Sequence, residues 1–139
     1  MSEQIQRTTW QKDNALLSNI RYQVFVDEQK VPIELEIDDD DPLAAHVLCL
    51  VDDHPVGTGR VLLDGHIGRL AVLQTHRKQG YGNKILHHLE LIAQENELTE
   101  VFLNAQITAI PFYEKRGYTI ISDVFDDAGI PHQTMRKPL

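Results

Sequence analysis

Hydrophobic and polar residues follow two periodicities along this chain, and together they predict a mixture of strands and helices. Short runs rich in Ile, Leu and Val, bounded by turn residues, are typical of buried strands. Apolar residues spaced three or four positions apart are typical of helices that bury one face. Helical spacing occurs after Asp13, after Gly80 and between Thr108 and Gly117. The expected strands span residues 5–10, 45–51, 56–63, 67–73, 100–104, 118–122 and 133–137.

Turn residues and connection lengths predict how several strands pair. Asp64-Gly65 favours a two-residue type I′ hairpin turn leading into residues 67–73. A helix separates residues 67–73 from residues 100–104, so a right-handed crossover should make these two strands parallel. Residues 123–132 are expected to form a loop between the last two strands.

Capping residues set the expected helix boundaries. The first helix should have Asp13 or Asn14 as its N-cap. It should end by Gln29, because Pro32 disfavours helical geometry in the residue before it. The short third helix should be capped by Thr108.

Length and composition indicate one domain spanning residues 1–139. The formal net charge of −8 excludes a duplex nucleic-acid binder, which would present a dominant basic face. No apolar run approaches the ~20 residues of a membrane span, and the N-terminus lacks a signal-peptide pattern. The single cysteine, Cys49, excludes an internal disulfide, so we expect a cytoplasmic protein with no membrane partner.

Residues 67–82, reading IGRLAVLQTHRKQGYG, form a candidate anion site. An apolar strand, a basic turn containing Gly80 and Gly82, and a helix start follow one another, an order that directs free backbone N–H groups at one point. Residues 65–89 contain no Asp or Glu but four basic residues, namely Arg69, Arg77, Lys78 and Lys84. This pattern predicts a site for a phosphate-bearing ligand, and the alternative is a solvated helix start with a flexible glycine turn.

Residues 34–41 contain six acids in eight positions. They form either a solvated loop or an acidic lip that attracts a cationic substrate. A calcium loop of the EF-hand type is excluded, because Leu43 occupies the position that requires glycine.

Candidate metal ligands and nucleophiles are few. His87 and His88 are adjacent and point ~100° apart around a helix, so they cannot chelate one metal, and we expect no metal site. Cys49 alternates into a strand interior and is expected in the core rather than as a nucleophile.

Three motifs, in this order and spacing, together resemble the GNAT superfamily of acetyl-CoA-dependent N-acyltransferases. The match extends across the chain and is similar to a small bacterial branch through VFVDEQ (residues 24–29), LNAQ (residues 103–106) and AGIPH (residues 128–132). The three motifs are Leu70-Ala71-Val72, Arg77-x-x-Gly80-x-Gly82 and FYEKRGY at residues 112–118.

This resemblance implies the acyl-CoA N-acyltransferase fold. That fold is of the α+β class, with a single mixed, mostly antiparallel twisted sheet of about six to seven strands flanked by helices. Strands 67–73 and 100–104 should splay apart to admit the pantetheine arm of the coenzyme.

The resemblance also assigns roles to individual residues. Backbone groups of Leu70 and Val72, with Ala71 between them, would bind pantetheine, and Asn104 would reach pantetheine or order the strand end. Tyr113 would lie near the coenzyme sulfur. The pyrophosphate would be held by the backbone amides of Arg77, Lys78, Gln79, Gly80, Tyr81 and Gly82.

Acetyl transfer to an amine needs three chemical functions. A base must remove a proton from the ammonium group before it can attack the thioester. An N–H donor must stabilise the oxyanion, and a bulge beside Val72 would offer one. The departing thiolate can take a proton from Tyr113, whose alternative role is aromatic packing.

The resemblance leaves the base open. Many family members carry a glutamate four residues before the strand valine, where this chain has Gly68. Arg69, beside this gap, would bind a substrate carboxylate or serve the anion site. The candidate bases are Glu28, Glu36, His46 and His132, each of which has an alternative structural role.

Two functional hypotheses follow. The first is an N-acetyltransferase that moves an acetyl group from acetyl-CoA to a primary amine of a small molecule or peptide. The second is a non-catalytic acyl-CoA-binding sensor, which the glycine at position 68 keeps open. Acetyl-CoA and an amine are the expected partners, without nucleic acid, and edge strands near the C-terminus leave a homodimer open.

Overall fold

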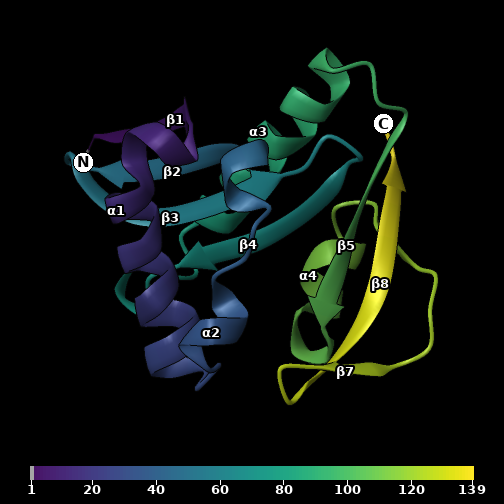
Figure 1. The fold of residues 1–139 in the computed structure, drawn as a ribbon. Helices are drawn as coiled ribbons and strands as arrows, with labels where there is room; N and C mark the ends of the chain where they lie inside the picture. Colours follow the sequence, from purple (N-terminus) through teal and green to yellow (C-terminus); the bar gives the residue numbers. More distant parts are fainter. Residues whose placement is uncertain (1) are drawn as a thin grey trace.

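A computed structural model describes residues 2–139, which form an eight-stranded sheet with helices on both faces (Figure 1). Neighbouring strands follow the order β1-β2-β3-β4-β5-β8-β6, and β7 pairs with β8. All pairs are antiparallel except β4 with β5, so the expected mixed, mostly antiparallel sheet is confirmed. The strands are β1 (Glu3–Thr8), β2 (Ala45–Val51), β3 (His54–Val61), β4 (His66–Val72), β5 (Glu100–Gln106), β6 (Thr119–Ile120), β7 (Phe125–Asp127) and β8 (Ile130–Pro138). The helices are α1 (Trp10–Arg21), which continues as a π-helical segment (Tyr22–Glu28), α2 (Ile33–Glu36), α3 (Tyr81–Glu95) and α4 (Ile110–Glu114).

The parallel strands β4 and β5 pair only at their starts. Their register contains the pairs His66 with Phe102 and Ile67 with Leu103. Beyond Ile67 the two strands diverge, as Figure 1 shows, while β5 keeps its antiparallel partner β8 along its whole length. The predicted splay is therefore present, and it opens the middle of the sheet.

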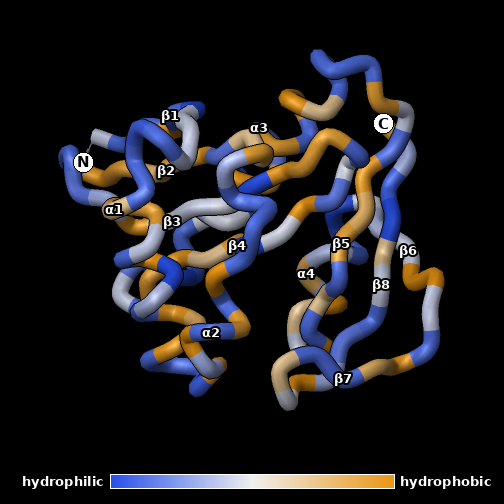
Figure 2. The backbone as a smooth tube through the Cα atoms, in the orientation of Figure 1, coloured by the Kyte–Doolittle hydropathy of each residue, from blue (hydrophilic) through white to orange (hydrophobic). Residues whose placement is uncertain are grey.

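Two helices cover opposite faces of the sheet and bury its two apolar surfaces. Helix α3 places Ile85, Leu86 and Leu89 in the main core. Helix α1 packs Leu17 and Ile20 in a smaller cluster on the other side. Much of β2 and β4 is hydrophobic, as Figure 2 shows, because both of their faces are covered.

The β3–β4 hairpin differs from the sequence-based prediction of a two-residue type I′ turn. The amide of Gly65 donates to the carbonyl of Leu62 at 3.0 Å, and the turn comprises three residues, 63–65. Gly65 alone among these three has a positive φ, of +94°. A three-residue hairpin loop that ends in a left-handed glycine uses the same Asp-Gly signal as the type I′ turn, which explains the error.

Helix boundaries are confirmed at some ends and wrong at others. Helix α1 begins three residues before Asp13, because the Thr9 side chain accepts the amide of Lys12 at 3.2 Å and acts as the N-cap. The helical stretch ends at Gln29 as predicted. Thr108 does not cap α4, which starts after Ala109 without a side-chain cap. No helix within residues 2–139 is long and apolar enough to cross a membrane.

The predicted loop at residues 123–132 contains strand β7 and the start of β8. Polar residues occupy much of β7 and of the start of β8, so hydrophobic periodicity did not reveal these two strands. The β7–β8 hairpin places His132 opposite Gln106, at the open end of the splay.

Candidate active site

The splay between β4 and β5 contains a cavity of about 420 Å³. Strand β4, strand β5, the π-helical segment, α4 and the β7–β8 hairpin all contribute to its wall. Six of the residues that the resemblance assigns to the coenzyme line it together, namely Leu70, Ala71, Val72, Arg77, Asn104 and Tyr113. The remaining candidates, residues 78–82, form the adjoining turn and helix start.

The turn before α3 has the geometry of an anion site. Gly80 has φ +87° and precedes Tyr81, the first residue of a 15-residue helix. No side chain caps this helix end and its first turn carries no acid, so its first N–H groups are open to a ligand. Tyr81 is only 4% exposed and belongs to the main core, so it anchors the start of this helix.

The side-chain charge around this turn is lower than the sequence predicted. Arg77 forms two 2.6 Å hydrogen bonds with Glu28, and Lys84 pairs with Glu3. The acid-free window in sequence is therefore not acid-free in space, because β1 and the π-helical segment bring carboxylates to it. Lys78 has no ion-pair partner among residues 2–139. The backbone N–H groups are therefore the main donors that this turn offers to an anion.

The backbone of Val72 faces the splay. The amide of Leu73 donates to the carbonyl of Val56 at 2.8 Å, across to β3. The Leu73 N–H and the Val72 C=O belong to the same peptide group and point in opposite directions. The N–H and C=O of Val72 therefore point away from β3, toward β5. Its carbonyl accepts the Arg77 Nε–H at 2.9 Å, which ties the turn to the strand end. This orientation fits the predicted pantetheine contacts.

Strand β4 contains a β-bulge, but not beside Val72 as predicted. The pair Thr58–Ala71 is followed by the pair Arg60–Gly68, so β4 carries one extra residue between them. Arg69, in this stretch, has φ +52°, a conformation that non-glycine residues rarely adopt. A bulge removes a peptide group from the ladder, so a backbone N–H in this stretch, between Gly68 and Ala71, is available to a ligand.

Asn104 is held at the end of the splay by its own sheet. Its Oδ1 accepts the Thr134 hydroxyl at 2.8 Å from β8. The Asn104 amide nitrogen retains its two donors. The predicted roles of ordering the strand end and reaching the ligand are therefore compatible.

Tyr113 is half-buried against two aromatic rings and lines the cavity. Its ring lies 5.1 Å from that of Phe112 and 5.7 Å from that of Tyr118, edge to face in both cases. Burial raises the pKa of Tyr113 to about 12. The phenol is therefore protonated near neutral pH and can donate a proton.

Three of the four candidate bases are engaged in structural contacts. Glu28 is bound to Arg77, whose hydrogen bonds lower the pKa of this carboxyl group. Glu36 is 7% exposed and pairs with Arg21. His46 is 1% exposed, its Nε2 lies 2.9 Å from a backbone carbonyl, and burial lowers its pKa. His46 lies outside the residues that line the cavity.

His132 lines the cavity and keeps one ring nitrogen free. Its Nδ1 lies 2.6 Å from the carbonyl oxygen of Ile130, which can only accept a hydrogen bond. Nδ1 must therefore carry the proton, and Nε2 of the neutral ring is an acceptor. The ring stacks on Phe125 at 6.0 Å, which fixes its orientation.

Residues 34–41 turn three of their six acids, Glu36, Asp38 and Asp41, inward, while the other three stay exposed. Asp41 is 1% exposed and accepts hydrogen bonds from Arg21 at 2.7 and 3.0 Å. Arg60 donates to Asp41 at 2.8 Å and to Asp38 at 2.7 Å. Hydrogen bonds from Arg60 lower the pKa of Asp38 to about 2, so it stays ionised. Both interpretations of this segment are wrong for its inward-facing acids, which pair with arginines from α1, β3 and β4.

One other sequence-based candidate, Cys49, has a clear outcome. Cys49 is fully buried, and burial raises the pKa of its thiol to about 11, so its predicted place in the core is confirmed. No cluster of three or more His, Cys, Asp or Glu side chains suited to a metal occurs within residues 2–139.

Comparison with known proteins agrees with the geometry of the splay and the glycine turn. A model of the acetyltransferase (GNAT) domain matches residues 9–139. The chain belongs to the GNAT acetyltransferase family. It is 42% identical over 122 residues to the uncharacterized N-acetyltransferase YjcF of Bacillus subtilis, an alignment that covers 85% of this chain and 87% of that protein.

Solved GNAT structures share the fold over nearly the whole chain. An acyl-CoA N-acyltransferase from Pseudomonas aeruginosa aligns with a TM-score of 0.88 and 27% identity, covering 98% of this chain and 99% of that chain. Escherichia coli ElaA aligns with a TM-score of 0.86 and 28% identity, covering 96% and 99% respectively. The GNAT family uses acyl-CoA donors, and the backbone donors and cavity described above fit such a ligand.

One prediction for the GNAT site concerns Gly80. The Gly80→Val variant is expected to bind CoA at least about tenfold more weakly, because a left-handed conformation costs a non-glycine residue about 1–2 kcal/mol and the turn would rearrange. Gly80→Asn is the matched control. Asn tolerates this conformation, and a Cβ at Gly80 meets no atom within 4 Å, so its affinity should stay within about threefold. Calorimetry with CoA measures both, and equal affinities for Val and wild type would place the pyrophosphate elsewhere.

Sequence reasoning missed one site residue, Arg60. It lies in the buried strand β3, is 5% exposed and lines the cavity. An arginine between Gly59 and Val61 in an apolar strand is a usable signal, because a buried guanidinium needs carboxylate partners. The six acids of residues 34–41 were the available partners.

Proposed function

We propose that this protein transfers an acetyl group from acetyl-CoA to a primary amine, with His132 as the base and Tyr113 as the acid. The observation that supports this most is that one cavity is lined by both a protonated phenol and a histidine with a free Nε2. A base and an acid on the walls of one cavity match the two proton transfers of the reaction.

The donor would bind along β4. Amides of the turn at residues 77–82 would hold the pyrophosphate, and the outward peptide groups of Val72 would bind pantetheine. The splay would then place the thioester near the bulge at Arg69, where a free N–H can stabilise the oxyanion.

The residues carry out the transfer in a balanced sequence. His132 Nε2 takes a proton from the ammonium, and the amine nitrogen forms a bond to the thioester carbonyl carbon. When the C–S bond breaks, its electron pair stays on sulfur, which takes the proton of Tyr113. The second nitrogen proton restores the Tyr113 phenol, so the reaction yields an amide, free CoA thiol and one released proton.

Thiol release in the presence of an amine panel tests this proposal. Wild type is expected to release CoA thiol in an amine-dependent manner. His132→Ala should lower kcat by roughly 10²-fold, and added imidazole should restore part of it, a rescue that a packing role would not give. The exposed His87 provides the matched control, His87→Ala, with unchanged kcat. Binding of acetyl-CoA without turnover of any amine would favour the sensor hypothesis instead.

A further inference from the structure

Arg60 lines the cavity, and its guanidinium group is only partly hydrogen-bonded. Its Nη1 donates to Asp38 at 2.7 Å and to Asp41 at 2.8 Å, and its Nη2 donates to Asp38 at 2.7 Å. Its Nε has no hydrogen-bond partner among residues 2–139. The side chain is 6% exposed, so the one surface left to this N–H is that of the cavity. A donor in such a place favours an oxygen ligand.

Gly68 leaves room directly beside this donor. Arg60 and Gly68 are partners in the β3–β4 register. A Cβ at Gly68 would lie 3.9 Å from Arg60 Nε, with no other heavy atom within 4 Å. The missing side chain therefore leaves a space, next to a guanidinium N–H, that a small group can occupy.

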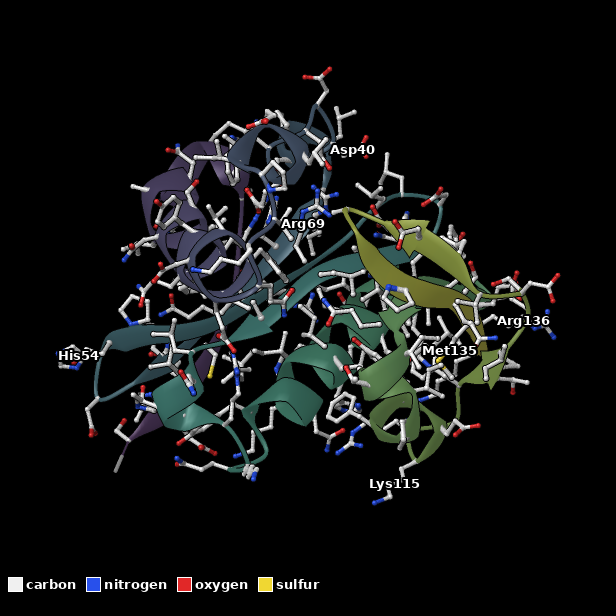
Figure 3. All side chains as sticks on the ribbon, turned by 90° about the horizontal axis from the view of Figure 1, so that it is seen from below. Asp40, His54, Arg69, Lys115, Met135 and Arg136 are labelled. Atoms are coloured by element: carbon white, nitrogen blue, oxygen red, sulfur yellow. The ribbon has the colours of Figure 1, made fainter. Side chains whose placement is uncertain are left out.

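Arg69 contributes a second donor to the same place. Its Nη2 donates to the carbonyl of Glu36 at 3.0 Å and to Asp38 at 3.1 Å, and its Nε donates to the Glu36 carbonyl at 3.3 Å. Its Nη1 has no partner among the described residues, and its side chain is 27% exposed. Figure 3 shows Arg69 near the segment that carries Asp40.

The surrounding charges permit an anion here. Three guanidinium groups face three carboxylates in this cluster, so it carries no net charge. Asp38 lies 3.1 Å from Arg69 Nη2 and is paired with Arg60, and Glu36 lies 3.7 Å from Arg69 Nε and is paired with Arg21. His66 also lines the cavity. Burial lowers its pKa, which favours the uncharged form of the ring.

We propose that Arg60 Nε, Arg69 Nη1 and the open face of Gly68 form a subsite for a carboxylate group of the acceptor, which makes the acceptor an amino acid or a similar short amino carboxylate. The amine part of this inference rests on the proposed acetyl transfer. Gly68 is two residues from Leu70, about 7 Å along an extended strand and less across a bulge. An amine near the bulge and a carboxylate at Gly68 therefore suit a short amino acid.

Matched acceptors test the ligand class. Glycine, alanine, β-alanine and 4-aminobutyrate, each paired with its carboxamide, are assayed with acetyl-CoA, with rates corrected for the amine that is unprotonated at the assay pH. At least one carboxylate should exceed its carboxamide by tenfold or more in kcat/KM, with most of the difference in KM. Equal use of both members in every pair would overturn the inference, because a neutral carbonyl would then be enough.

Gly68→Ala tests the location. The added methyl makes ordinary contact with Arg60 Nε and leaves the arginine–carboxylate pairs intact, so the variant should fold. The preference for the carboxylate should fall below threefold while the rate with its carboxamide changes little. Arg69→Gln removes the charge of a side chain that is 27% exposed, and it should also reduce the preference for the carboxylate. A preference that survives in both variants would contradict the assignment.

A binding measurement separates this inference from the proposed function. N-acetylglycine and N-acetylglycinamide are titrated into the protein with saturating CoA and followed by NMR. The carboxylate should bind at least tenfold more tightly to wild type than to Gly68→Ala, and the carboxamide should not discriminate. If no amine is ever acetylated, this result keeps the subsite while the function fails. Equal binding of the carboxylate to both proteins would overturn the subsite.

Discussion

Tyr113→Phe is expected to lower kcat by roughly 10²-fold while leaving the fold and CoA affinity nearly unchanged. The substitution removes the hydroxyl but keeps the ring that packs on Phe112 and Tyr118. The pKa of Tyr113 is raised to about 12, so the phenol is protonated at neutral pH. The variant therefore lacks a proton donor that wild type has at this pH. Steady-state kinetics with saturating amine, together with calorimetry for CoA, measure both effects.

The melting temperature, measured together with kcat, distinguishes catalysis from packing in this variant. If Tyr113 only packs the helix, the melting temperature should fall while kcat per folded molecule stays at the wild-type value, and that result would contradict the acid role. Phe112→Leu is a matched control on the same helix, because it alters aromatic packing without removing a hydroxyl. It should affect stability more than kcat.

Asp41→Ala is expected to destabilise the protein by about 3–5 kcal/mol. Asp41 is 1% exposed and binds both Arg21 and Arg60, so its removal leaves two guanidinium groups partly unpaired in the interior. A domain of this size is stable by about 5–15 kcal/mol, so the loss would lower the melting temperature by roughly 10–20 °C. Urea unfolding followed by circular dichroism measures it.

Asp39→Ala is the matched control for this prediction. Asp39 belongs to the same acidic run but is exposed, and its loss should change stability by less than about 0.5 kcal/mol. If both variants changed stability by equal, small amounts, residues 34–41 would be a solvated loop. Their ion pairs would then not hold Arg60 and Arg69 in place.

The fold was largely predictable because its signals are local. The short apolar runs of β2 and β4 and the 3.6-residue period of α3 follow from which faces are buried. Glycines with positive φ mark the β3–β4 hairpin, the β7–β8 hairpin and the turn before α3, namely Gly65, Gly129 and Gly80. Strand β7 was missed because its pairing with β8 depends on backbone hydrogen bonds in a polar segment rather than on burial.

The site was predictable where backbone geometry defines it and not where distant charges meet. The glycine turn and the positions of Val72 and Tyr113 follow from motif order, and all lie at the splay. The partners of Arg77 and Arg69, Glu28 and Asp38, are 49 and 31 residues away in sequence. Such pairs are set by tertiary packing, so a charge count along the chain does not reveal them.

Isotope transfer tests the central claim most directly. The protein is incubated with acetyl-CoA labelled in both acetyl carbons and with the amine panel, and the products are identified by mass spectrometry. We predict that the label appears in an amide bond of one acceptor, with one CoA thiol released for each acceptor acetylated. Label recovered only as free acetate, or left entirely on CoA while the protein binds it, would contradict acetyl transfer to an amine.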